Sequence, residues 1–198
     1  MDRPPTVSFT RRNLPHWQVV GRPYFVTFRL KGSIPVSLYR DMMRQRTALD
    51  NAADVASRNL HRQQLRCLEA VLDVPDPAVA WLRDARLASV VIESLAFAET
   101  EWAWRIPAYV VMPNHVHVLL AGAEKAARTL PLTLASIKKF TAREANRILG
   151  RNGAFWQEES FDHWCRDVGK EEACIDYIHE NPVKARLVSD WHDWPWIR

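Results

Sequence analysis

Two histidines separated by one residue have the clearest chemical potential in the sequence. His115 and His117 flank Val116 in a run that alternates with period two, directly after the Pro113-Asn114 turn signal. Side chains two apart on a strand project from the same face, so both imidazoles can converge on one metal ion. The alternative is a pair of ordinary, partly buried histidines. Burying two imidazoles without polar partners is costly, and this cost favours a site.

A tyrosine and an amide form a second constellation near the end of the sequence. Cys174, Tyr177, Ile178 and Asn181 recur at helical spacing, so they share one stripe of a predicted helix. Asn181 stands directly before Pro182, which is expected to kink or end that helix and so to free the amide for a ligand. A core phenol with its hydrogen-bond acceptor is the simpler alternative.

The elements that must position these residues alternate between strands and helices. The pattern predicts, in order, a strand at 24–30, charged helices within 36–72, helical segments within 79–98, strands at 102–112 and 115–120 joined by a tight turn, a helix at 132–149, a short strand within 155–165 and a helix from 170. This order predicts an α+β sandwich with a central antiparallel sheet and helices on its faces. We expect a basic flexible arm at 1–20, a single domain at 21–190 with 36–72 as a helical insertion, and a tail at 191–198.

Composition narrows the classes of function. The 198 residues carry 27 Lys and Arg against 23 Asp and Glu, a formal charge of +4 that permits a nucleic-acid partner. Six glycines and the absence of a phosphate-binding glycine motif argue against nucleotide chemistry. Three widely spaced cysteines, Cys67, Cys165 and Cys174, are expected to be reduced packing residues. No run is apolar enough for a membrane span or a signal peptide, so a soluble cytoplasmic protein is expected.

Three motifs together carry a resemblance to a known family. The runs VVMPNHVHVLL (110–120), FWQ (155–157) and YIHENPVKA (177–185) resemble the IS200-like single-tyrosine transposases, and most of all the REP-associated tyrosine transposases of bacteria. The resemblance covers about 24–188. Where the family usually reads Glu-Asn-Asn-Pro, this chain reads His179-Glu180-Asn181-Pro182.

The resemblance implies a fold, a metal and a reaction. It implies a ferredoxin-like core in which His115, His117 and Asn181 bind Mg²⁺ or Mn²⁺ and Tyr177 is the nucleophile. The implied activity is nicking and strand transfer of single-stranded DNA at hairpin-forming repeats, through a 5′-phosphotyrosine. The implied setting is the bacterial nucleoid, with the protein a monomer or a homodimer. His163 and His179 are candidate proton shuttles, with exposed histidines as the alternative.

Basic and aromatic residues predict a surface that would hold DNA. Lys139, Arg143 and Arg147 recur every four residues on one helix and form a cationic stripe. A solvated helix face is the usual reading of such a stripe, but a phosphodiester site nearby favours phosphate contacts. The other candidates are Lys138 beside the stripe, Arg151 beyond it, Arg11 and Arg12 in the arm, Trp156 for stacking on bases and Gln157 for reading base edges.

Two other functions remain open at this point. One is a protein of the same ancestry that binds structured DNA without turnover. The other is a zinc hydrolase that uses His115 and His117 with a carboxylate such as Glu158. A covalent adduct between Tyr177 and DNA would separate the transposase-like enzyme from both.

Overall fold

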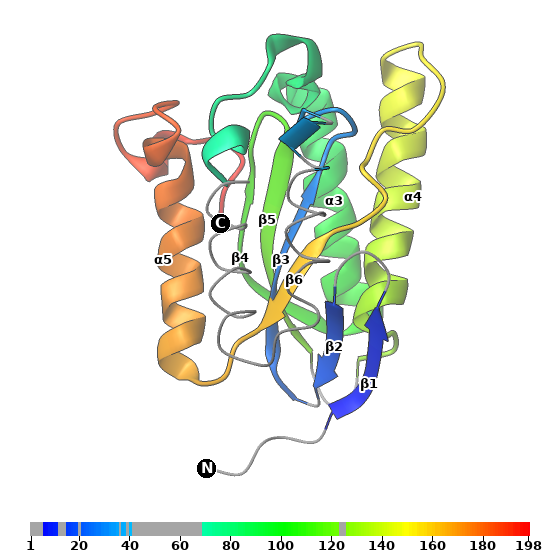
Figure 1. Cartoon of the computed structure of the whole chain (residues 1–198), viewed down its shortest axis with the longest axis vertical. Coiled ribbons are helices and arrows are strands. Elements are labelled where there is room, and N and C mark those ends of the chain that lie inside the picture. Colours follow the sequence, from blue (N-terminus) through cyan, green and yellow to red (C-terminus); the bar gives the residue numbers. More distant parts are fainter. Residues whose placement is uncertain are drawn as a thin grey trace.

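The chain is built around a four-stranded antiparallel sheet with helices on both faces (Figure 1). The computed structural model describes residues 6–11, 15–19, 21–35, 37–38, 40, 69–122 and 126–198. Its sheet strands are β3 (Pro23–Arg29), β4 (Trp104–Val111), β5 (His115–Gly122) and β6 (Phe161–Trp164). The long helices are α3 (Ala85–Trp102), α4 (Leu130–Ile148) and α5 (Val168–Lys184). The α+β class and its antiparallel sheet were correctly predicted from the sequence.

The strand order is that of a ferredoxin-like sheet. The strands lie in the order β4-β5-β3-β6, while α3 connects β3 to β4 and α4 connects β5 to β6. Each of these connections joins two parallel strands of one sheet, and such crossovers are right-handed. Both helices therefore lie on the same face of the sheet, and α5 is left to cover the other face (Figure 1).

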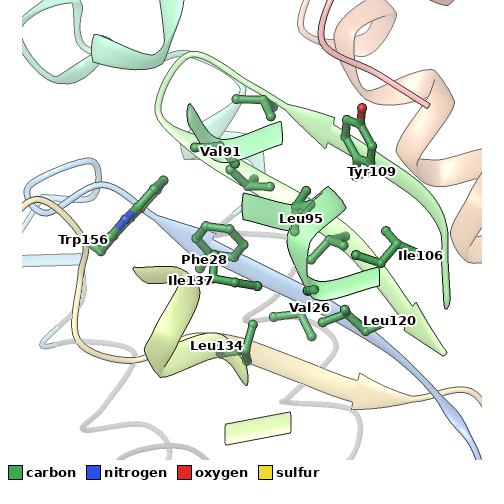
Figure 2. Packing of buried hydrophobic residues seen from close by; sticks show 14 of the residues in the cluster. Val26, Phe28, Val91, Leu95, Ile106, Tyr109, Leu120, Leu134, Ile137 and Trp156 are labelled. Atoms are coloured by element: carbon green, nitrogen blue, oxygen red, sulfur yellow. The ribbon is translucent and has the colours of Figure 1, made fainter. Parts of the chain in front are cut away.

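The alternating pattern of β5 sorts its side chains between these two faces. Val116, Val118 and Leu120 belong to the core beneath α3 and α4, whereas Leu119 belongs to the cluster beneath α5. Because both faces are covered, all of β5 except its last residue is buried. Figure 2 shows the larger core, in which Val26, Phe28 and Leu120 of the sheet pack near Leu95 of α3 and Leu134 and Ile137 of α4.

Helix α3 begins later than the sequence indicated. Asp76 caps a turn, accepting a bond from Ala78 N, and this turn is the short 3-10 element η1 (Pro77–Val79), followed by η2 (Trp81–Arg83). The α-helix starts after a second cap, Asp84, whose carboxylate accepts from Arg86 N. Two adjacent capping residues therefore divide the apolar pattern into a turn and a helix.

The two ends of the chain are more ordered than predicted. The arm predicted at 1–20 contains β1 (Thr6–Arg11), which pairs antiparallel with β2 (Pro15–Val19). The residues predicted as a flexible arm thus contain a paired hairpin, because aromatic and β-branched residues outweigh the arginines and prolines there. The segment predicted as a tail begins with η3 (Trp191–Asp193), and Arg198 then exchanges both backbone bonds with Tyr109, covering the edge of β4.

Other expectations concern parts of the chain with little or no description. Of the helices predicted within 36–72, the described residues 37, 38, 40 and 69–72 are helical, and the others lie outside the described residues. Cys67 and Arg12 also lie outside them. Within the described part of the chain, no helix combines the length and the apolar character that crossing a bilayer requires.

Candidate active site between the sheet and its last helix

His115 and His117 lie side by side on the face of β5 that α5 covers. Both are buried, at 0% and 1% exposure, and their Nε2 atoms are 3.0 Å apart. Each Nδ1 atom has its own partner: Asn114 Oδ1 lies 2.7 Å from His115 Nδ1, and Thr27 Oγ1 lies 2.7 Å from His117 Nδ1. Thr27 is the residue of β3 that pairs with His117 in the sheet. Both rings are thus held from behind, with their Nε2 atoms facing each other.

The two imidazoles are neutral at neutral pH. Burial lowers the pKa of His115 to about 3, and burial together with the neighbouring His115 lowers the pKa of His117 well below its ordinary value. Because Asn114 Oδ1 only accepts, His115 carries its proton on Nδ1 and presents a lone pair at Nε2. His117 then donates its Nε2 proton to that lone pair, and its Nδ1 accepts from the Thr27 hydroxyl, which can rotate to accept instead.

Tyr177 reaches these histidines from α5. Its ring packs edge-on against His117, with ring centroids 5.3 Å apart, and against Phe25 at 5.6 Å. The hydroxyl donates to the Glu69 carboxylate and accepts from the Asn181 amide. Burial and the charge of Glu69 raise the pKa of Tyr177 above its ordinary value, and the bond from Asn181 offsets part of this. The phenol is therefore protonated and oriented by two neighbours.

Asn181 leaves a buried oxygen without a partner. The residue is 1% exposed, and among the described residues no group hydrogen-bonds to its Oδ1. A buried polar atom of this kind needs an explanation, and a cation ligand is one. Helix α5 continues past Pro182 to Lys184, so Asn181 is not the helix end that the sequence suggested. It lies one turn beyond Tyr177 on the same stripe.

The donor atoms fit a hard divalent cation. Adjacent ligands of an octahedral ion, each about 2.1 Å from it, are about 3.0 Å apart, which matches the spacing of the two Nε2 atoms. Within the described ranges no cluster of three His, Cys, Asp or Glu side chains could hold a metal. The amide oxygen of Asn181, buried and without a partner, is a donor that could complete a ligand set with the two imidazoles. Two imidazoles and one amide oxygen leave positions open for substrate and water.

Sequence reasoning missed the charged residues around the tyrosine. Burial raises the pKa values of Glu69 and Asp73, while Lys184 Nζ lies 5.0 Å from the centroid of the Tyr177 ring. Glu69 could not be singled out from the sequence, because the charged segment that precedes it has too few apolar residues to show which helix face is buried. Thr27 had a usable signal, since it is polar in an aromatic and β-branched strand. Of the two candidate proton shuttles, His163 interacts with Glu69, whereas His179 stacks on Trp191 with ring centroids 4.0 Å apart.

The cationic stripe on α4 is exposed, as expected, but it is not near the tyrosine. The side chains of Arg143 and Arg147 are about seven-tenths exposed, at 72% and 71%, and both pair with Glu144. Lys139 is also exposed. Because α4 and α5 cover opposite faces of the sheet, the stripe is separated from Tyr177 by the sheet and its core (Figure 1). The expectation that stripe and site are neighbours is wrong.

Several residues predicted to contact DNA have structural partners instead. Lys138 Nζ donates to the carbonyls of Gln157 and Glu158, both at 2.6 Å, and burial lowers its pKa to about 8. Arg151 lies over the Trp81 ring at 4.0 Å. Trp156 is 6% exposed and donates from its indole to Thr141 Oγ1 at 2.8 Å. Figure 2 shows it in the core, where its ring is not exposed for the stacking on bases that the sequence suggested. The side chain of Arg11 is outside the described residues.

Lys138 and its neighbour Lys139 offer a matched test of this assignment. We expect Lys138→Met to lower the free energy of unfolding by about 1–3 kcal/mol, because the two carbonyls of the 157–158 loop lose the charged donor that they share. Lys139→Met changes an exposed residue and should leave stability within about 0.5 kcal/mol of wild type. Urea unfolding followed by tryptophan fluorescence measures both. Equal losses in the two variants would contradict the structural role of Lys138.

Comparisons with known proteins agree with this fold. No known protein-family model matches the chain. A solved structure of a REP-associated tyrosine transposase bound to a REP hairpin superposes with a TM-score of 0.57 at 17% identity, covering 90% of this chain and 77% of the other. The chain therefore shares the fold of that structure, with a four-stranded antiparallel sheet and flanking helices.

A curated protein sequence is more similar to this chain than the solved structure above is. A Haemophilus influenzae protein named "Putative REP-associated tyrosine transposase" is 29% identical over 98 residues. The matched region spans 45% of this chain and 55% of the relative, about half the length of each. Sequence and fold together relate the chain to the REP-associated tyrosine transposases, as the motifs had indicated.

Proposed function

We propose that the chain is a metal-dependent enzyme that nicks and rejoins single-stranded DNA through Tyr177, at hairpin-forming repeats. One observation supports this most. A single helix brings Tyr177 against His117, whose Nε2 atom faces that of His115, and it carries the unpaired amide oxygen of Asn181 one turn beyond Tyr177. A protein of this kind would act at the bacterial nucleoid.

The proposed reaction exchanges one phosphodiester for another. Tyr177 Oη attacks phosphorus, the bond from phosphorus to the 3′ oxygen breaks, and the phosphate remains on the tyrosine as a 5′-phosphotyrosine. The phenolic proton passes to Glu69, which already accepts a hydrogen bond from it, and the leaving 3′ oxygen takes a proton from solvent. Attack by a 3′-hydroxyl reverses these steps. The energy of the broken bond is conserved, so rejoining needs no nucleotide.

His115, His117 and Asn181 would hold Mg²⁺ or Mn²⁺ beside the scissile phosphate. The ion would neutralise charge that develops on the phosphate oxygens in the transition state. Asn114 and Thr27 would keep the two Nε2 atoms directed at it. The exposed stripe of Lys139, Arg143 and Arg147 would contact a part of the DNA remote from the cleaved bond, because it lies across the sheet.

A covalent adduct tests the proposal. The full chain is incubated with Mn²⁺ and single-stranded oligonucleotides that contain a hairpin and carry a label at the 3′ end. Because the phosphate stays with the 3′ fragment, the label should migrate with the protein on a denaturing gel, and EDTA should prevent this. Hairpin binding without an adduct would overturn nicking and support a DNA-binding protein of the same ancestry. Zinc-dependent cleavage without an adduct would support a hydrolase.

Thr27 allows the metal to be tested separately from the reaction. Thr27→Val keeps the shape of the side chain but removes the hydroxyl that holds His117 Nδ1, so we expect Mn²⁺ affinity to fall about 10- to 100-fold. Thr27→Ser keeps the hydroxyl and should retain most of the affinity. Calorimetric titration of the DNA-free protein measures both. An unchanged affinity in Thr27→Val would show that the hydroxyl does not orient a ligand.

A further inference from the structure

Two buried cysteines and a histidine meet where β6 faces the first half of α5. Cys165 Sγ and Cys174 Sγ are 3.8 Å apart and form no disulfide. His163 Nε2 lies 3.8 Å from Cys174 Sγ. The cysteines also pack beside Phe25 and Ile178 in the cluster beneath α5, which is the ordinary role of buried thiols. Direct contact of two sulfurs with an imidazole beside them is more than packing requires.

The contacts make the two sulfurs chemically unequal. The two thiols bond to each other, and this bond, together with the neighbouring His163, lowers the pKa of Cys174 against the effect of burial. The same bond and burial raise the pKa of Cys165. The thiolate is the nucleophilic form of cysteine. Because the His163 imidazole lies against Cys174, Cys174 is the sulfur prepared to react, with Cys165 in contact to complete a disulfide.

A pocket that a small oxidant could enter reaches Cys165, the partner of Cys174 in this pair. Cys165 lines a pocket of about 330 Å³ whose other walls include Arg22 of the segment before β3, Arg105 of β4 and Glu171 of α5. Hydrogen peroxide is far smaller than this volume. The sulfurs themselves are almost fully buried, which excludes large reagents and favours a small oxidant.

We propose that Cys165 and Cys174 are a redox modification site that a peroxide converts reversibly into a disulfide. The Cys174 thiolate attacks one oxygen of hydrogen peroxide, the O–O bond breaks, and the departing hydroxide takes a proton to become water. Cys165 sulfur then attacks the Cys174 sulfenic acid, and the S–O bond breaks as a second water forms. Two thiols and one peroxide thus give one disulfide and two waters, and an external dithiol reverses the change.

The disulfide would tie α5 to the sheet. Cys174 precedes Tyr177 by one turn and shares its stripe with Asn181, so the bond is made on the helix that carries both residues. The sulfurs must approach from 3.8 Å to about 2.05 Å, which is a small movement. We expect the oxidised form to open less often along α5, and its backbone amides to exchange hydrogen more slowly.

Thiol counting tests the proposal without any DNA reaction. A Cys67→Ser background removes the third thiol. The protein is treated with hydrogen peroxide, denatured in maleimide and analysed by peptide mass. Cys165 and Cys174 should lose labelling together, the unlabelled mass should fall by two hydrogens, and dithiothreitol should restore labelling. In Cys165→Ser, the sulfenic acid should be trapped on Cys174 by dimedone. His163→Ala should slow the loss of labelling about tenfold.

Other outcomes would overturn it. Labelling that persists on both cysteines, loss of one without the other, or protection that a zinc chelator removes would each exclude the disulfide. Unchanged amide exchange along α5 in the oxidised protein would exclude the tether. Because these readouts need neither metal nor DNA, they are independent of the proposed nicking activity.

Discussion

Tyr177→Phe abolishes the covalent adduct with hairpin DNA while leaving the protein folded and able to bind DNA. The change removes one oxygen, and that oxygen is the proposed nucleophile. The ring stays and keeps its edge-on contacts with His117 and Phe25. The loss should exceed about 10³-fold, because the variant has no oxygen at the position of the proposed nucleophile.

Tyr109→Phe is the matched control for this variant. Tyr109 is a buried tyrosine whose ring packs in the core beneath α3 and α4, on the far face of the sheet from α5. It should form adduct at the wild-type rate. An adduct that survives Tyr177→Phe would identify another nucleophile. Loss of adduct in both variants, with lowered stability, would point to general damage rather than to chemistry.

Which residues share one face of a strand or helix could be predicted from the sequence. Which side of the sheet that face lies on could be seen only in the fold. Period two correctly placed His115 and His117 on one face of a strand, and helical spacing correctly placed Tyr177 and Asn181 on one stripe. Spacing alone does not say which face of the sheet a helix covers. The right-handedness of the two crossovers does determine this face. It places α4, and with it the cationic stripe, across the sheet from Tyr177.

The sequence located the helices and strands better than it distinguished structural from exposed residues of the same type. Lys138 and Lys139 are adjacent and chemically identical, yet one is bonded to the carbonyls of the 157–158 loop and the other is exposed. Their difference depends on where the 157–158 loop returns to α4, a contact between distant parts of the chain. Trp156 is a similar case, because an aromatic residue beside a polar one is compatible with a place in the core and with a surface that stacks on bases. Glu69 and Tyr177 are more than one hundred residues apart in the sequence, so their contact is visible only in the folded chain.

Glu69→Gln slows adduct formation by about 10²- to 10⁴-fold, which is the usual contribution of a general base. The amide oxygen of glutamine still accepts the hydrogen bond from Tyr177, so the phenol stays in place, but it cannot take up the proton. DNA affinity should therefore remain within about threefold of wild type. Single-turnover rates with saturating DNA, measured beside the dissociation constant, separate the two effects.

Asp73→Asn is the matched control, because Asp73 is a second partly buried carboxylate beside Glu69 that interacts with Tyr177 only through its charge. Its loss should change the rate less than tenfold. An equal loss in both variants would mean that negative charge, not proton transfer, is what the site needs. A rate within threefold of wild type in Glu69→Gln would assign the proton to another acceptor.

The pH profile gives an independent reading of the same carboxylate. Glu69 is surrounded by Asp73, by Tyr177 and Lys184 of α5 and by His163 of β6, and burial is the largest cause of its raised pKa. It can accept a proton only when ionised, so the wild-type rate should fall as pH decreases through this raised pKa, above the range where an ordinary glutamate titrates. Glu69→Gln should lose this acid limb and keep a low, flat rate. A limb that persists unchanged in Glu69→Gln would belong to another group.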